Sequence, residues 1–269
     1  MCWHYDHTSG QTIKGINLIT TLYHVNGVSL PVNYHLVSKP EGYLDAKTGK
    51  PKRRATVTKN EVYRQLLRQV VANQIPFRYV LNDVWFASAD NMKFVIHELK
   101  RDFIMPLKAN RKLALSVEDK KQGRYVRVDS LEIETNTVMT IYLEGVDFPL
   151  HLVKQVFTNG DGSIGILYLV TSDPDLAYDE ITTIYQKRWN VETYHKSLKQ
   201  NASLSKSPTR TVTTQSNHFF AALCAFIKLE LLKVTTKTNH FALKSKLYMQ
   251  ALQTAFQTLH QLQPVRLAA

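Results

Sequence analysis

Residues 185–199 read YQKRWNVETYHKSLK, and this stretch carries the strongest indication of fold and function in the chain. In a helix, successive residues rotate by about 100°, so Tyr185, Arg188, Glu192 and Lys199 fall within one narrow stripe of its surface. A phenol, a guanidinium, a carboxylate and an ammonium group then point the same way. The stretch predicts a helix that carries one acid among cations on a single face.

Such a face suits phosphate chemistry, because Glu192 can hold a divalent metal ion while Arg188 and Lys199 neutralise phosphate oxygens. The alternative is a solvated helix face with an i,i+4 ion pair, which contributes only about 0.3–0.5 kcal/mol. The residue types alone leave both interpretations open.

The spacing of all four residues resembles the Tyr-Arg-Glu-Lys signature of one large branch of bacterial insertion-sequence transposases. These are DDE enzymes with a ribonuclease H-like catalytic core. The resemblance implies that Glu192 is the third member of an Asp-Asp-Glu metal-binding triad. It also implies that Arg188 and Lys199 contact the phosphate backbone of the transposon end, with support from Tyr185.

Two neighbours of this signature are further candidates for DNA binding. Lys196 adds a cation, and Trp189 can stack on a displaced or flipped base. For Trp189, half-buried core packing is the stronger expectation.

A second acidic residue is expected at the end of a buried strand upstream, and the sequence FRYVLND at residues 77–83 fits. Taken alone, Asp83 suits a helix cap or a turn. The following segment, VWFAS at residues 84–88, makes Asp83 resemble the second aspartate of the same transposase family. We therefore assign Asp83 as a metal ligand, together with Glu192.

The first catalytic aspartate of this family is not found in the chain. In relatives it ends the first core strand, upstream of a segment that resembles residues 2–7, and the chain begins at Met1. Asp6 lies in a His- and Gly-containing stretch, and we do not assign it to the triad. The first strand would lie between the second and fourth, so its absence leaves two strand edges facing an empty slot. We expect an N-terminally truncated copy whose activity is in doubt.

For an intact relative, the resemblance implies two Mg²⁺ (or Mn²⁺) ions and phosphoryl transfer that cuts transposon ends and joins them to target DNA. Two alternatives stay open. One is a catalytically dead remnant that binds DNA, and the other is a ribonuclease H-like nuclease that does not transpose. A tyrosine recombinase is disfavoured, because no pocket of several arginines accompanies Tyr185.

Charge agrees with DNA as the partner. The chain has 34 Lys and Arg against 22 Asp and Glu, a net charge of +12 and a pI near 9.6, which favours polyanions. Cations concentrate in residues 187–210 and 50–54; for residues 50–54 an exposed loop and a DNA contact are equally good explanations. A homodimer on DNA is a further possibility that the family suggests.

Two cysteines indicate neither a disulfide framework nor a cysteine-based zinc site, and Cys2, His4, Asp6 and His7 form only a weak metal motif. The longest apolar run, residues 219–227, is far shorter than the roughly 20 residues that span a bilayer. We therefore expect a cytoplasmic protein without a membrane partner that associates with the nucleoid when bound to DNA.

The overall pattern predicts an α/β, ribonuclease H-like mixed sheet flanked by helices, with an all-β insertion and the first core strand missing. We divide the chain into residues 1–108, the N-terminal part of the core; 109–172, the β-rich insertion; and 173–269, the C-terminal helical part. Strands are expected at 16–23 and 28–37 around Asn26-Gly27, and a capping box at Thr58–Glu61 starts a helix. A largely buried helix is expected at 217–234, and a last, amphipathic helix at 247–262.

Overall fold

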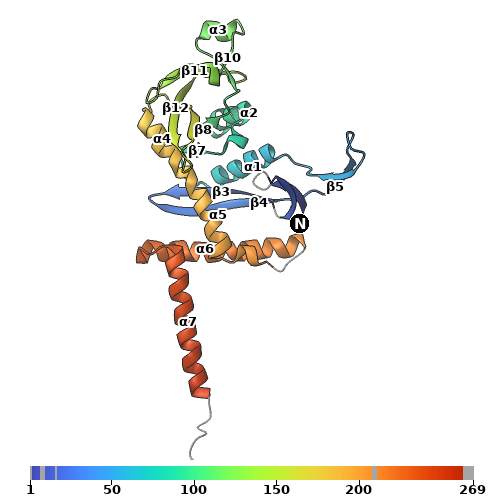
Figure 1. Ribbon diagram of the computed structural model, residues 1–269, viewed down its shortest axis with the longest axis vertical. Coiled ribbons are helices and arrows are strands. Elements are labelled where there is room, and N and C mark those ends of the chain that lie inside the picture. The colour runs from blue at the N-terminus through green and yellow to red at the C-terminus, as the bar shows by residue number, and fades with distance from the viewer. Residues whose placement is uncertain (1, 7–9, 16, 208–210, 263–269) are drawn as a thin grey trace, which may run out of the picture.

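A computed structural model describes residues 2–6, 10–15, 17–207 and 211–262. Its largest element is a seven-stranded mixed sheet (Figure 1) with the strand order β10-β9-β11-β12-β13-β8-β7. The strands are β7 (Tyr79–Leu81), β8 (Asp102–Leu107), β9 (Lys112–Ala114), β10 (Val126–Arg127), β11 (Met139–Leu143), β12 (Leu150–Thr158) and β13 (Ile164–Thr171). β7 and β8 run parallel, and the other described pairs in this sheet are antiparallel.

Helices cover both faces of this sheet, which explains the uninterrupted apolar run of β8. Phe103, Ile104 and Met105 are completely buried although they alternate between the two faces. One face packs against α2 (Ala89–Lys93) and the π-helical turn η2 (Phe94–Leu99), whereas Ile104 on the other contacts the Ile181 cluster of α4 (Tyr178–Gln186). The sheet therefore forms the middle layer of a three-layer α/β unit.

A long hairpin forms a second unit beside this sheet. It consists of β3 (Asn17–Val25) and β4 (Val28–Val37), and Asn26 and Gly27 have φ values of 49° and 76° at its turn, as a type I′ turn requires. One face packs against α1 (Lys59–Ala72), which starts with the predicted Thr58–Glu61 capping box. The other packs against α6 (Val212–Thr236). The hairpin lies between α1 and α6 (Figure 1).

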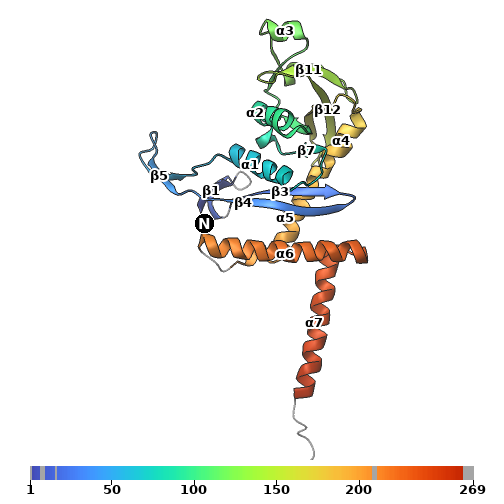
Figure 2. The same ribbon diagram turned by 180° about the vertical axis from the view of Figure 1, so that it is seen from behind.

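One helical segment joins the two units. α4 ends at Gln186, a 3₁₀ turn η4 (Lys187–Trp189) follows, and α5 (Asn190–Gln200) continues. Ile181 packs on the main sheet, whereas Tyr194 and Leu198 pack against α6 and the hairpin. Seen from behind (Figure 2), this segment runs from the main sheet past the hairpin to α6.

The two units are not joined by backbone hydrogen bonds between strands. In the described part of the chain, β7 pairs only with β8, and β3 pairs only with β4. β7 and β3 therefore each keep one unpaired edge. These two edges are the ones expected to flank the first core strand.

The remaining elements are smaller or project from the body. The described short strands pair as β1 (Cys2–Asp6) with β2 (Gln11–Gly15), and as β5 (Glu41–Leu44) with β6 (Pro51–Arg54). Single helical turns are η1 (Val84–Phe86), α3 (Val117–Lys121), η3 (Val128–Ser130) and η5 (Leu204–Lys206). The last helix, α7 (His240–Leu262), points away from the rest of the molecule (Figure 1). It begins seven residues before the predicted start at Leu247.

The predicted fold class is confirmed: the structure is a mixed α/β fold with helices flanking the sheet, consistent with a ribonuclease H-like DDE fold. The strands predicted for the β-rich insertion continue the same sheet, because β13 pairs with β8 from Tyr168↔Leu107 to Thr171↔Ile104. The division into residues 1–108, 109–172 and 173–269 stays a prediction.

Candidate functional site

Asp83 lies at the carboxyl end of β7, where the chain leaves the sheet. Its side chain is exposed at the surface, and Oδ1 accepts a hydrogen bond from the backbone N–H of Val84 at 2.5 Å. This bond caps the 3₁₀ turn η1. The capping role considered for Asp83 is thus present, and its second carboxylate oxygen is not engaged by that cap.

Tyr185 connects the two sequence motifs. Its side chain is only 6% exposed, and its hydroxyl donates to the carbonyl oxygen of Asn82 at 3.3 Å. Asn82 also donates from Nδ2 to the hydroxyl of Tyr63, at 3.1 Å, which fixes the end of β7 against α1. Residues 103 positions apart in sequence are therefore held together beside Asp83.

The surroundings of Tyr185 also act on its ionisation. Burial raises the pKa of the Tyr185 phenol to about 12, with a further rise from the Asp83 carboxylate and an opposing effect from Arg188. The phenol is therefore a neutral hydrogen-bond donor at physiological pH. Because the ring is buried, it can support the site but offers no surface for direct contact with DNA.

Arg188 and Glu192 lie on the outward continuation of this helical segment. The Arg188 guanidinium carbon lies 5.8 Å from the Tyr185 ring centroid and 5.1 Å from that of Trp189, distances at which cation–π attraction acts. Its Nη1 lies 3.5 Å from Glu192 Oε1, and the Arg188 side chain is 16% exposed against 57% for Glu192. The i,i+4 pair is present, and the Glu192 carboxylate still faces solvent.

Two expectations for this segment are wrong. Residues 185–199 do not form one uninterrupted α-helix, because the 3₁₀ turn at 187–189 separates α4 from α5. The predicted stripe therefore runs from the core at Tyr185 to the surface at Glu192. Trp189 is 62% exposed rather than half-buried in the core, so its ring is available for stacking.

The other two cations of the segment differ in their surroundings. Lys199 is exposed on α5, two turns beyond Glu192. Lys196 is also exposed, and its Nζ lies 5.6 Å from the ring centroid of Phe241 at the base of α7. Lys199 can thus extend the Arg188 surface along α5, while Lys196 lies where α5 meets α7.

The basic segment at residues 50–54 is a hairpin arm rather than an irregular loop. β5 and β6 form this arm, whose residues are exposed, and it projects from the body (Figure 1). Lys52 pairs with Asp45, and Arg54 Nε lies 2.9 Å from Glu41 Oε2. Two of the four cations are thus partly neutralised within the arm, which weakens the case for a strong DNA contact there.

The carboxylates fit a divalent cation only in part. Asp83 and Glu192 offer the hard oxygen ligands that Mg²⁺ and Mn²⁺ prefer. A two-ion site also takes a carboxylate that bridges the ions. Over the residues that the structure describes, no group of three or more His, Cys, Asp or Glu side chains could hold a metal ion. These two acids alone do not complete a two-ion site, and the side chains of Cys2, His4, Asp6 and His7 lie outside the described residues.

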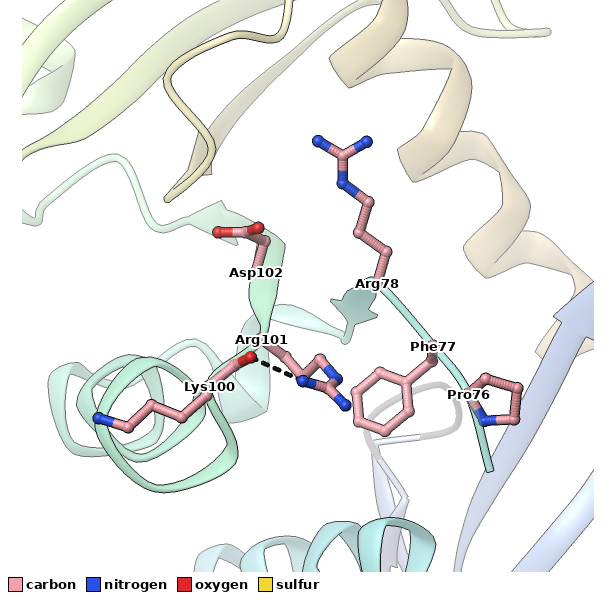
Figure 3. Close-up of a pocket in the computed structure, with 6 residues that line it drawn as sticks. All are labelled: Pro76, Phe77, Arg78, Lys100, Arg101 and Asp102. Carbon is pink, nitrogen blue, oxygen red and sulfur yellow. Dashed lines mark hydrogen bonds between the residues drawn. The ribbon is translucent and has the colours of Figure 1, made fainter. Parts of the chain in front are cut away.

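A surface hollow of about 480 Å³ lies at the opposite end of β7 and β8, lined by Pro76, Phe77, Arg78, Lys100, Arg101 and Asp102 (Figure 3). Its two guanidinium groups are engaged, since Arg78 Nη2 donates to Asp173 at 2.8 Å and Arg101 lies over the Phe77 ring. The hollow adjoins the amino ends of the parallel strands, whereas Asp83 follows the carboxyl end of β7. We assign it no role in the chemistry at Asp83.

Together, the fold and these side chains give the class: a mixed α/β protein, consistent with a ribonuclease H-like fold, whose surface combines exposed acids with cations suited to phosphates. Residues 1–127 match the family described as DDE superfamily endonuclease. The match includes Asp83 and ends before Tyr185. It supports a nuclease or transposase of the DDE type. A comparison with curated proteins found no match. Within the described residues, no helix has the length and apolar character needed to cross a membrane.

Proposed function

We propose that this chain comes from a DNA transposase of a bacterial insertion sequence, which cuts transposon ends and joins them to target DNA by metal-dependent phosphoryl transfer. The observation that carries the proposal is the hydrogen bond from Tyr185 to Asn82. It joins the strand-end aspartate segment to the Tyr-Arg-Glu-Lys segment, which the family match does not cover. A homodimer on DNA belongs to this proposal.

Each candidate residue has a separate task. Asp83 and Glu192 would hold Mg²⁺ or Mn²⁺ in the complete catalytic unit, and a bound ion would supply Lewis-acid chemistry for phosphoryl transfer there. Arg188, held by two aromatic rings, and Lys199 bind phosphate oxygens of the transposon end. Trp189 provides an exposed ring for an unstacked base, and Tyr185 positions Arg188 from the core.

The missing carboxylate is part of the same proposal. We infer that the complete unit includes an apolar strand ending in aspartate, which pairs with both β7 and β3. The unpaired edges of these two strands support this inference. Translating the DNA upstream of the Met1 codon in all frames tests it: an open or once-shifted frame that encodes such a strand is the expected result, and unrelated sequence refutes it.

The function is tested with the chain, and with the upstream-extended chain if that frame exists. The substrate is a plasmid carrying the genomic DNA that flanks the gene on both sides. From the upstream-extended chain we expect nicking and end joining only with Mg²⁺ or Mn²⁺, lost on Asp83→Asn or Glu192→Gln and retained in Glu98→Gln, an exposed acid paired with Arg68. Mn²⁺ binding, followed by calorimetry, should weaken in the same two variants and not in the control.

Other results select the alternatives. DNA binding that is indifferent to metal and to Asp83→Asn favours the catalytically dead remnant. Equal cleavage of the flanking DNA and of an unrelated plasmid favours a ribonuclease H-like nuclease without transposition. If neither the chain nor the upstream-extended chain binds or cleaves DNA, all three proposed functions are refuted.

A further inference from the structure

The helix α7 has an exposed apolar stripe that no other part of the described chain covers. Only its first turn is anchored: Leu243 is buried, and Lys244 donates to the backbone oxygen of Gln200. Every residue from 245 to 261 is exposed. At about 1.5 Å per residue these 17 positions extend about 25 Å beyond the anchored turn, in agreement with the projection in Figures 1 and 2.

The exposed apolar residues lie on one side of this helix. With about 100° of rotation per residue, they fall within about 60° of the direction of Leu252: Tyr248, Met249, Leu252, Ala255, Phe256 and Leu259. Leu243 lies on the opposite side, toward the body. Phe241 belongs to the anchored first turn. Of the two large apolar residues that remain beyond it, Leu247 points about 140° away from the stripe, and Leu262 closes the described helix.

The charges of α7 favour a second copy of this chain as the occupant. From Leu247 to Leu259 the helix carries no charged residue, so this segment offers nothing to DNA phosphates and does not repel an identical helix. The chain as a whole has a net charge of +12, which opposes close approach of two bodies. The projecting, uncharged segment is the part that two copies can bring together.

The same charges select an antiparallel arrangement. Parallel helices would place Lys244 and Lys246 beside their copies, at the end where both basic bodies would also meet. Antiparallel helices separate the bodies and place the lysines of each helix beside the distal turns of the other. With the twofold axis at Leu252, Tyr248 of one copy meets Phe256 of the other, and Ser245 meets Leu259.

The available area is sufficient for a specific contact. The five large stripe residues are each 52–61% exposed. Large aromatic side chains bury roughly 150–250 Å² each, so two stripes together can remove on the order of 1,000 Å² from water. A specific interface needs about this area. We propose that α7 is a self-association helix, through which two copies of this chain form an antiparallel helical pair without requiring DNA or metal.

The test measures the oligomeric state of the chain by sedimentation equilibrium without DNA. We expect a dimer at micromolar concentration, and a dissociation constant at least about 100-fold higher in Leu252→Glu, since charge replaces an apolar contact in both copies. Leu247→Glu is the matched control, because it places the same charge on the same exposed helix but off the stripe. It should dimerise like the wild type. Both variants should keep the wild-type urea unfolding midpoint when measured as monomers.

Disulfide trapping tests the orientation in a background in which both native cysteines are replaced, Cys2→Ser and Cys224→Ser. Tyr248→Cys combined with Phe256→Cys should yield a cross-linked dimer, whereas each single variant should not. A wild-type monomer up to about 100 µM, dimerisation only with DNA, or equal effects of Leu252→Glu and Leu247→Glu would each overturn the proposal. Cross-linking of the single variants would overturn the antiparallel arrangement. None of these outcomes depends on catalytic activity.

Discussion

Replacing Glu230 by alanine should destabilise the protein strongly, because this carboxylate is buried where three elements meet. It is 2% exposed. Oε1 accepts from the backbone N–H of Ser29 on β4 at 2.9 Å and from Lys233 Nζ at 2.6 Å. Oε2 lies 2.8 Å from His240 Nε2 at the start of α7, within ion-pair distance although without an aligned hydrogen bond. Glu230 thus fastens α6 to the hairpin and to α7.

The magnitude follows from what each partner loses. A buried N–H without an acceptor costs about 1–3 kcal/mol, and this applies fully to Ser29, which is 7% exposed. Breaking a fully buried ion pair costs about 3–5 kcal/mol. That figure must be reduced for Lys233, whose side chain is 34% exposed and also donates to the Gly27 carbonyl. We expect Glu230→Ala to lower the free energy of unfolding by about 2–4 kcal/mol.

Urea unfolding followed by circular dichroism measures this loss. The control is Glu98→Ala, which removes an acid that also pairs with a cation, Arg68, but with both side chains about half exposed; a loss below about 1 kcal/mol is expected there. Glu230→Gln keeps an acceptor for Ser29 and should retain part of the stability. A loss in Glu230→Ala no larger than in Glu98→Ala would refute the role assigned to the buried carboxylate.

Two further predictions concern buried polar groups. Burial lowers the pKa of His24, His195 and His240, despite the raising effects of nearby glutamates. Below about pH 6.5 the unfolded chain therefore binds protons that the folded chain does not, and the free energy of unfolding should fall from pH 7.5 to pH 5, by up to about 1.4 kcal/mol for each unit by which a histidine pKa is lowered. Urea titrations across this range measure the fall, and a flat profile would contradict it. Tyr185→Phe removes one hydrogen bond without leaving a cavity and should lower the free energy of unfolding by about 0.5–1.5 kcal/mol. Tyr185→Ala also removes the buried ring and should lower it by about 3–5 kcal/mol. Equal losses for the two variants in thermal or urea unfolding would show that the hydroxyl, rather than the ring, makes the main contribution to stability.

Local sequence signals predicted many of the secondary-structure elements. Asn26-Gly27 permits the positive φ values of the hairpin turn, and Thr58 with Glu61 satisfies the free N–H groups at the start of α1. The apolar run at 103–105 is typical of a strand with both faces covered, and the structure buries it completely. These features depend only on residues close together in the chain, so they can be predicted from one sequence.

Other features depend on partners far away in sequence. Helical periodicity did not reveal the 3₁₀ turn at 187–189, because backbone rotation changes little there and the residues remain near the α region. Trp189 is apolar and follows a buried segment, yet the turn exposes it. The Glu230 cluster combines residues from β4, α6 and α7, and no local pattern marks such a convergence. Asn82 carries no local signal, because its importance comes from Tyr63 and Tyr185, which approach from two different helices.

The interior position of β8, between β13 and β7, has a consequence for synthesis of the chain. Its antiparallel partner in the sheet, β13, ends at Thr171, which is 64 residues after Leu107. At roughly 5–20 residues per second, β8 waits roughly 3–13 s on the ribosome with its apolar run open to other chains. Arg101 and Asp102 precede this run, and Lys108 follows it. Charges at such positions disfavour intermolecular strand pairing. These three side chains therefore lower the tendency of the newly made β8 to aggregate until β13 has been synthesised.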